Sequence, residues 1–398
     1  MKRHLLAGIL ALSALAGGCA NQDKGPKVAN PQPVPLNTFQ KVWYADLGLN
    51  GARATNVYLF DNYIIVYASD YTAHVVDRQS GALKWIHPLR KNAGDLHAPS
   101  VFGDRIVYPA TSALKVYSTK SGLLVRETDV DFAISAGGTG MGQFYYVAAN
   151  YPNGGRLVAM DLERNDSLPR WEVMTVAPIR SAPVHADSIT YFASENGTVR
   201  AVNEQRASIW GLDDTPDGGF KCSGPVYADL TVDSGIVYVA SMDTKLYALT
   251  QASGKIKWQY FASGVPLQDK PDVTGDTVYL KVRGKGLVAI NKSEGKDFRE
   301  ARWTNPDAEK FLADDAKHTY VLTRDGFITA LDKATGKPQW TSKRKDFVAF
   351  GADTNPKDGQ IYAVTKDGQL LCIKAVTKVG VVGEVVMEDT RAMEIASR

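Results

Sequence analysis

Histidine and cysteine are scarce in this chain, which has six histidines and three cysteines among 398 residues. No two of them have the His-x-x-x-His or Cys-x-x-Cys spacing of a compact metal site, so the sequence predicts no metal centre. We expect surface or strand-edge positions for the dispersed histidines, which are His74, His87, His97, His185 and His318. Cys222 and Cys372 read as unpaired core residues, although an oxidising compartment would permit a disulfide between them.

A clear excess of one charge sign is also missing, since 46 lysines and arginines stand against 43 aspartates and glutamates. A domain that binds nucleic acid usually carries a marked basic surplus. The nearly neutral balance therefore gives no reason to expect nucleic acid as a partner.

Long apolar runs are absent apart from Leu5–Ala16 near the start of the chain. That run is too short to remain as a helix across a bilayer. It follows the basic residues Lys2 and Arg3 and precedes small residues, which is the pattern of a secretory signal peptide. We therefore expect residues 1–18 to be a signal segment.

Ala16-Gly17-Gly18-Cys19 resembles a bacterial lipobox, in which the cysteine is lipidated and becomes the new N-terminus. Ala20 after Cys19 then implies the outer membrane, with the chain anchored by lipid on the periplasmic face. Ordinary cleavage without a lipid is the alternative. Residues 19–38 are rich in proline and poor in bulky apolar groups, so we expect them to act as a flexible tether.

Helical periodicity is missing from most of the chain, and a repeat takes its place. Ala330-Leu-Asp-Lys-Ala-Thr-Gly-Lys-Pro-Gln-Trp340 has close copies at Ala248–Trp258 and Val75–Trp85. Each copy reads as the end of a strand, a turn with glycine at positive φ, and a new strand. All seven tryptophans fall into this register or extend it, and Arg126 stands at the tryptophan position of a further copy. The tryptophans are Trp43, Trp85, Trp171, Trp210, Trp258, Trp303 and Trp340.

A repeat of roughly 40–45 residues with about four short strands is typical of a β-propeller blade. Eight strand triplets can be counted, among them a fifth unit that begins with Gly224–Ala228. We predict an all-β, eight-bladed propeller of four-stranded antiparallel blades over residues 39–375. The strand with Trp43 is expected to close the ring, and the apolar stretch Lys378–Val386 is the alternative. Residues 376–398 would then be an extra strand or a tail.

The repeat resembles that of the pyrroloquinoline-quinone-type propellers, which include the quinoprotein alcohol dehydrogenases. Those enzymes pair two adjacent cysteines with a calcium held by acidic and amide side chains. This chain has no adjacent cysteines and no matching acidic cluster. The resemblance therefore implies the fold, with no cofactor and no catalytic residue.

In length, lipobox, tether and blade number the chain is also similar to the BamB family of outer-membrane assembly lipoproteins. In that family a loop with an apolar residue and an arginine before Ser-Ala-Pro contacts the barrel protein BamA, which implies this role for Ile179 and Arg180 before Ser181. The family's next loop presents two aspartates before a proline. No acids directly precede Pro225 here, and the nearest ones are Asp213, Asp214 and Asp217.

The resemblance thus implies a non-catalytic scaffold in the outer membrane that binds BamA and nascent β-barrel proteins. Two alternatives remain at this level. One is a periplasmic propeller that binds an unknown ligand or partner, and the other is a quinoprotein dehydrogenase.

Overall fold

The computed structural model describes residues 34–164, 166–210, 218–293, 298–354 and 359–380. The chain divides into two compact units, of which Asn37–Val376 contains nearly all of the regular structure. The other unit combines Met1–Leu36 with Thr377–Arg398. Its described residues are the start of the strand Val34–Asp46 and the end of the strand Gln369–Gly380. The signal segment, Cys19 and residues 381–398 lie outside the described residues.

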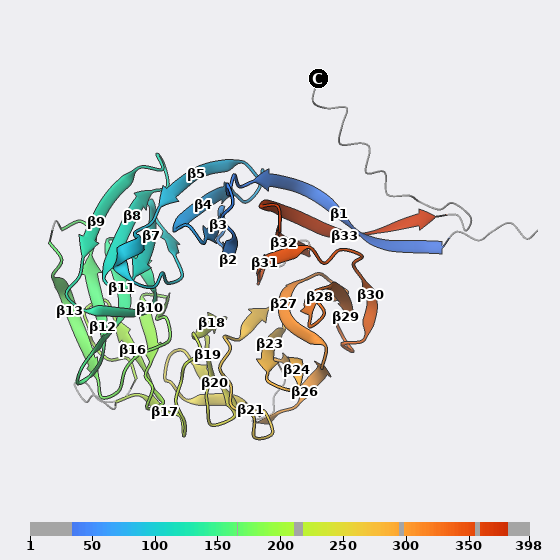
Figure 1. The fold of residues 1–398 in the computed structure, drawn as a ribbon. Coiled ribbons are helices and arrows are strands. Elements are labelled where there is room, and N and C mark those ends of the chain that lie inside the picture. Colours follow the sequence, from blue (N-terminus) through green and yellow to red (C-terminus); the bar gives the residue numbers. More distant parts are fainter. Residues whose placement is uncertain (1–33, 165, 211–217, 294–297, 355–358, 381–398) are drawn as a thin grey trace, which may run out of the picture. The chain divides into compact units, whose positions relative to one another are not determined.

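The larger unit is a ring of eight β-sheets, which follow one another in chain order around a centre (Figure 1). Within each sheet, consecutive strands pair in antiparallel fashion from the centre outward. The all-β, eight-bladed propeller is therefore confirmed.

The blades are numbered here along the chain. Blade 1 holds β2 (Ala54–Leu59), β3 (Tyr63–Ala68), β4 (Thr72–Asp77) and β5 (Leu83–Pro88). Blade 2 holds β6 (Ser100–Phe102), β7 (Arg105–Ala110), β8 (Ala113–Ser118) and β9 (Leu124–Asp129), and a short 3-10 helix, η1 (Lys91–Ala93), precedes it. Blade 3 holds β10 (Ala133–Met141), β11 (Phe144–Tyr151), β12 (Gly154–Asp161) and β13 (Pro169–Thr175). Blade 4 holds β14 (Val184–Ala186), β15 (Ile189–Ala193), β16 (Thr198–Asn203) and β17 (Phe220–Lys221).

The second half of the ring repeats this order. Blade 5 holds β18 (Thr231–Asp233), β19 (Ile236–Ala240), β20 (Lys245–Thr250) and β21 (Ile256–Phe261), with β25 (Phe298–Arg299) added at its outer edge. Blade 6 holds β22 (Asp272–Thr274), β23 (Thr277–Val282), β24 (Gly286–Asn291) and β26 (Ala301–Asn305). Blade 7 holds β27 (Ala308–Asp314), β28 (His318–Thr323), β29 (Ile328–Asp332) and β30 (Pro338–Thr341). Blade 8 holds β31 (Phe347–Gly351), β32 (Gln360–Thr365), β33 (Gln369–Gly380) and β1 (Val34–Asp46).

The core lies between the blades, where the faces of neighbouring sheets pack on each other. Middle strands are covered on both faces, so that all five residues of β19 are buried. This explains why these strands read as continuous β-branched and aromatic runs instead of alternating with polar residues. Outer strands such as β9 have one exposed face, so their residues alternate more between exposed and partly buried positions.

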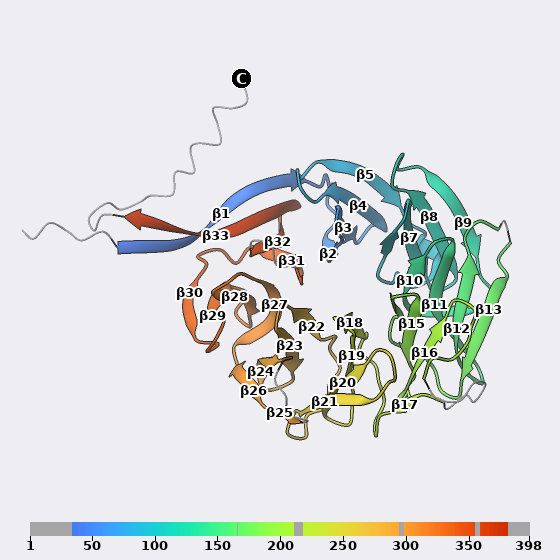
Figure 2. The same ribbon diagram turned by 180° about the vertical axis from the view of Figure 1, so that it is seen from behind.

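The ring is closed by the N-terminal strand, as predicted. β1 carries Trp43 and lies beside β33 as the outer strand of blade 8, which both views show (Figures 1 and 2). An ion pair at 2.6 Å between Arg78 and Asp353 joins blade 1 to blade 8. Lys378–Gly380, from the alternative stretch, belong to β33, and the rest of that stretch is outside the described residues. β1 begins at Val34, ahead of residue 39.

Three details differ from the sequence predictions. Gly224–Ala228 is not a strand, because β18 at Thr231–Asp233 is the inner strand of blade 5. Trp210 does not open the outer strand of blade 4, which is formed by β17. The histidine prediction is wrong for His74 and His87, which are buried. His87 faces blade 2, where its ring stacks on Tyr117 with the ring centroids 3.9 Å apart.

Candidate functional site

Strand order decides which loops share a face of the ring. In a blade of four antiparallel strands, the hairpin between the second and third strands lies at the same end as the connection to the next blade. We call this end the connection face. It carries the connections 176–183 and 222–230, and the hairpins that join β15 to β16 and β19 to β20.

The connection 176–183 contains both residues of the predicted partner-binding pair, but only one of them reaches the surface. Ile179 is fully buried, its amide donates to Asn150 Oδ1 at 2.9 Å, and its carbonyl accepts from Ser135 Oγ at 2.6 Å. These bonds hold the loop against blade 3. The side chain of Arg180 is 59% exposed and forms an ion pair with Glu195 of the next hairpin. Its hydrogen bond to that carboxylate raises the pKa of Arg180.

The predicted acids Asp213, Asp214 and Asp217 lie outside the described residues. Within the described chain, a second acid besides Glu195 contacts this connection: Asp229, whose Oδ1 accepts from the amide of Ala182 at 2.7 Å. Tyr227, in the same connection, is 37% exposed. Sequence reasoning missed both residues because it placed a strand at 224–228. Aligning Gly235–Ala240 with the second strand of the other units would have shown that 222–230 is a connection.

Main-chain hydrogen bonds link these loops into a continuous rim. The amide of Glu195 donates to Pro178 O at 2.8 Å. The amide of Cys222 donates to Gly197 O at 2.9 Å, that of Met242 donates to Pro225 O at 2.9 Å, and that of Leu267 donates to Ser241 O at 3.2 Å. The rim therefore runs from Arg180 across blades 4 and 5 to the start of blade 6, and it loses little conformational freedom when a partner binds.

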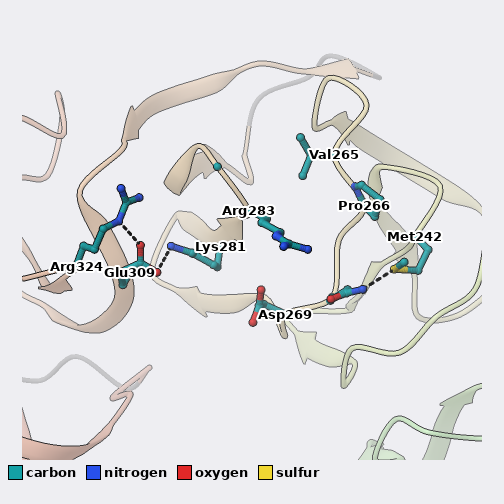
Figure 3. A pocket seen from close by; sticks show the side chains of 10 residues that line it. Met242, Val265, Pro266, Asp269, Lys281, Arg283, Glu309 and Arg324 are labelled. Atoms are coloured by element: carbon teal, nitrogen blue, oxygen red, sulfur yellow. Dashed lines mark hydrogen bonds and ion pairs between the residues drawn. The ribbon is translucent and has the colours of Figure 1, made fainter.

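A hollow of about 550 Å³ lies at the far end of this rim, where blades 5, 6 and 7 meet (Figure 3). Blade 5 and its connection to blade 6 supply an apolar wall of Met242, Val265 and Pro266. Apart from Gly284, the other lining residues are charged or polar and come mainly from blades 6 and 7: Gln268, Asp269, Lys281, Arg283, Glu309 and Arg324.

The residues present do not fit the quinone and calcium of the related dehydrogenases. Cys222 and Cys372 are buried free thiols in different parts of the ring, and burial raises the pKa of each to about 12. Among the described residues no group of three or more histidine, cysteine, aspartate or glutamate side chains is placed to hold a metal ion. No reaction step is therefore derived through these groups.

Within the same part of the chain, no helix has the length and apolar character needed to cross a bilayer. The model of the family described as outer membrane protein assembly factor BamB matches residues 219–320 and 284–379. Outer membrane protein assembly factor BamB of Yersinia pestis is 22% identical over 394 residues, which is 94% of this chain and 79% of that protein.

Among the solved structures that share the fold are a BamB and a dehydrogenase. The crystal structure of BamB from Moraxella catarrhalis has a TM-score of 0.62 at 15% identity and covers 85% of this chain and 98% of its own. Quinohemoprotein alcohol dehydrogenase from Comamonas testosteroni has a TM-score of 0.59 at 12% identity and covers 84% of this chain and 76% of its own. The propeller alone does not separate these two. The family model and the relative that matches 94% of this chain are both BamB, while a putative dehydrogenase XoxF of Paracoccus denitrificans is 29% identical over 126 residues, 29% of this chain and 20% of that protein. The chain is a BamB-like protein.

Proposed function

We propose that this protein is a non-catalytic scaffold that assists the assembly and insertion of β-barrel proteins in the outer membrane. It binds a BamA-type barrel protein through the loops of the connection face. The observation that carries this proposal is the position of Arg180, exposed on a connection whose backbone is held by Asn150 and Asp229. A charged side chain on a rigid support can bind without a large loss of conformational entropy.

The composition of the contact follows from what is exposed. Arg180 and Tyr227 lie close enough for Tyr227 to influence the pKa of Arg180. Arginine and tyrosine are enriched among the residues that dominate binding energy at protein interfaces. Ile179 takes part only indirectly, by anchoring the loop from within the core. The partner-binding role of Asp213, Asp214 and Asp217 stays a prediction, since these three acids lie outside the described residues.

Nascent barrel proteins would contact strand edges instead of loops. Extended segments add to an exposed sheet edge through main-chain hydrogen bonds. This chain does so with its own residues, since β25 pairs in parallel with β21 at the outer edge of blade 5. The other outer strands offer similar edges. In blade 2 the outer strand is β9, and the residue just before it, Leu123, is exposed.

The proposal includes a lipid anchor at Cys19, preceded by a signal segment of residues 1–18 and followed by a tether through residue 38. The anchor would place the ring at the periplasmic face of the outer membrane. Changing Cys19→Ser should release the protein into the soluble periplasmic fraction, while Cys372→Ser should not.

The test of the partner contact is a pull-down of the BamA-type protein with Arg180→Glu. We expect the charge reversal to reduce capture about tenfold or more, because it replaces an attraction with a repulsion in a docked surface. Lys255→Glu is the matched control, since Lys255 is exposed on the opposite face. Equal capture by both variants, with unchanged melting temperatures, would exclude this role for Arg180.

A further inference from the structure

The hollow at blades 5, 6 and 7 contains five charged side chains, and three of them pair with one another through a single carboxylate, which leaves one positive charge over. Glu309 accepts from Lys281 and from Arg324 Nε, the latter at 3.2 Å. These interactions lower the pKa of Glu309, so that its carboxylate stays charged. The three residues form a closed cluster along one wall, drawn with dashed lines in Figure 3.

The other two charged side chains of the hollow, Arg283 and Asp269, are not part of this cluster. Among the described residues, neither side chain has a hydrogen-bond or ion-pair partner within bonding distance. Figure 3 shows Arg283 extending into the space between Lys281 and Pro266, with Asp269 below it. Partial removal of Asp269 from water raises its pKa, although Lys281 acts in the opposite direction. The hollow therefore presents one free donor group and one free acceptor group beside an apolar wall.

A ligand that satisfies both groups must carry an anion and a hydrogen-bond donor a short distance apart. A peptide with an acidic side chain has both, because its carboxylate suits the guanidinium fork and its main-chain N–H groups suit the Asp269 carboxylate. A neighbouring apolar side chain would cover Met242, Val265 and Pro266. A small free anion offers no donor, and Asp269 would repel it.

We propose that this hollow is a docking site for an acidic segment of a protein partner, with Arg283 binding the carboxylate and Asp269 binding the peptide main chain. The site lies on the connection face and is joined to the Arg180 loop by the hydrogen bonds of the rim. It rests on the proposed scaffold function and deepens it, because it gives the partner a second contact at the far end of the rim.

Met242 provides a direct reporter for this site. Its side chain lines the hollow, and its sulfur accepts from Gln268 Nε2 at 3.4 Å. The full sequence contains seven methionines, which keeps a methyl-labelled spectrum simple. Met174, exposed on the outer strand of blade 3, serves as the internal control. The change Met242→Leu assigns the reporter signal.

The experiment titrates methionine-methyl-labelled protein with the acetylated and amidated tripeptide Leu-Asp-Leu and with its Leu-Asn-Leu analogue. We expect a saturable shift of the Met242 methyl with the aspartate peptide, and no shift of Met174. Binding should be about tenfold weaker for the asparagine peptide and for the variants Arg283→Gln and Arg283→Glu, because each lacks one charge-assisted hydrogen-bonded pair. Lys255→Glu should behave as wild type.

Three results would overturn the proposal: no shift of Met242, equal binding of the two peptides, or binding of succinate as tight as that of the aspartate peptide. The last result would identify a site for small anions. Two variants at Arg283 protect the test against a fold defect in one of them. The titration contains no barrel protein, so its outcome is independent of the pull-down with Arg180→Glu.

Discussion

Trp303 of blade 6 lies against Gly336 of blade 7, and its Nε1 donates to the carbonyl of Lys333 at 2.9 Å. The repeat that is visible along the chain is therefore a contact between blades. The tryptophan that ends one unit packs on the glycine turn of the next unit. The same relationship joins Trp43 to Gly81, Trp85 to Gly122 and Trp210 to Gly254.

This contact predicts that Gly336→Ala is much more damaging than an ordinary turn substitution. Gly336 has a φ of +68°, and an added Cβ would lie 2.5 Å from the Trp303 ring. We expect a loss of about 3 kcal/mol in the free energy of unfolding, from backbone strain together with overpacking. Gly326→Ala is the matched control, because Gly326 has a φ of +84° but open space around it. It should lose only about 1 kcal/mol. Equal losses in urea denaturation would contradict the packing argument.

The tryptophans themselves should differ in their contributions. Trp258 is 1% exposed and packs within the core between blades 5 and 6, whereas Trp340 is only half-buried and rests on Phe39 of the closing strand, with the ring centroids 4.6 Å apart. We expect Trp258→Ala to lower the free energy of unfolding by roughly 3–5 kcal/mol, and Trp340→Ala by less. Chemical denaturation measures both, and a melting temperature within a degree of wild type for Trp258→Ala would contradict its burial.

Arg126 takes the place of a tryptophan in blade 2, and its guanidinium donates to main-chain carbonyls of the turn in the next blade, as the indole of Trp303 does. Its Nη1 donates to the carbonyl of Asp161 at 3.0 Å, and it also reaches the carbonyls of Arg164 and Asp166. We expect Arg126→Ala to cost about 1–3 kcal/mol, because those carbonyls lose their donors. Arg126→Lys should recover less than half of that loss, since an ammonium cannot span three carbonyls in one plane. Full rescue by lysine in urea denaturation would show that charge alone matters.

His87 predicts a pH dependence of stability. Burial lowers its pKa to about 4 from an ordinary value of 6.5. Between about pH 4 and pH 6.5, the unfolded chain therefore binds a proton at His87 that the folded chain does not bind. The free energy of unfolding falls as the pH drops from about 6.5 to about 4. The expected loss is about 2–3 kcal/mol for this residue.

The variant His87→Phe keeps a ring against Tyr117 but loses the hydrogen bond between His87 Nδ1 and Tyr108 OH, which is 2.8 Å long. It should be less stable than wild type at pH 7, and the difference should shrink or reverse at pH 4. Unfolding free energies measured across this range provide the check. Parallel pH profiles for the two proteins would show that His87 does not titrate as described.

The fold could be predicted because each blade repeats the same local signals. The strand β29, the turn at Gly336 and the strand that opens before Trp340 form one copy of a pattern, and close copies at Ala248–Trp258 and Val75–Trp85 show it again. Blade 4 shows the limit. Its outer strand, β17, has only two residues and comes ten positions after Trp210, so that local propensity marks it poorly.

The candidate site was harder to predict, since its residues are close only after the ring forms. Arg180 was identified from a short sequence similarity. Asp229 was missed because a strand was expected at 224–228, and because its side chain meets the Arg180 loop only in the folded ring, by accepting from the amide of Ala182. The hollow around Arg283 draws on three blades, and no stretch of sequence signals that its neighbours Lys281 and Arg324 share one carboxylate.

The order of β1 and β33 within blade 8 has a consequence for how the molecule is made. The ribosome produces β1 first, yet β1 pairs with a strand that is produced last. The circle therefore stays open during synthesis, and it closes only once almost the entire polypeptide is available. Such a long-range pairing is slow, and until it forms both ends of the circle expose unpaired strand edges of the kind that invite aggregation. A chain that stops before β33 would keep them exposed.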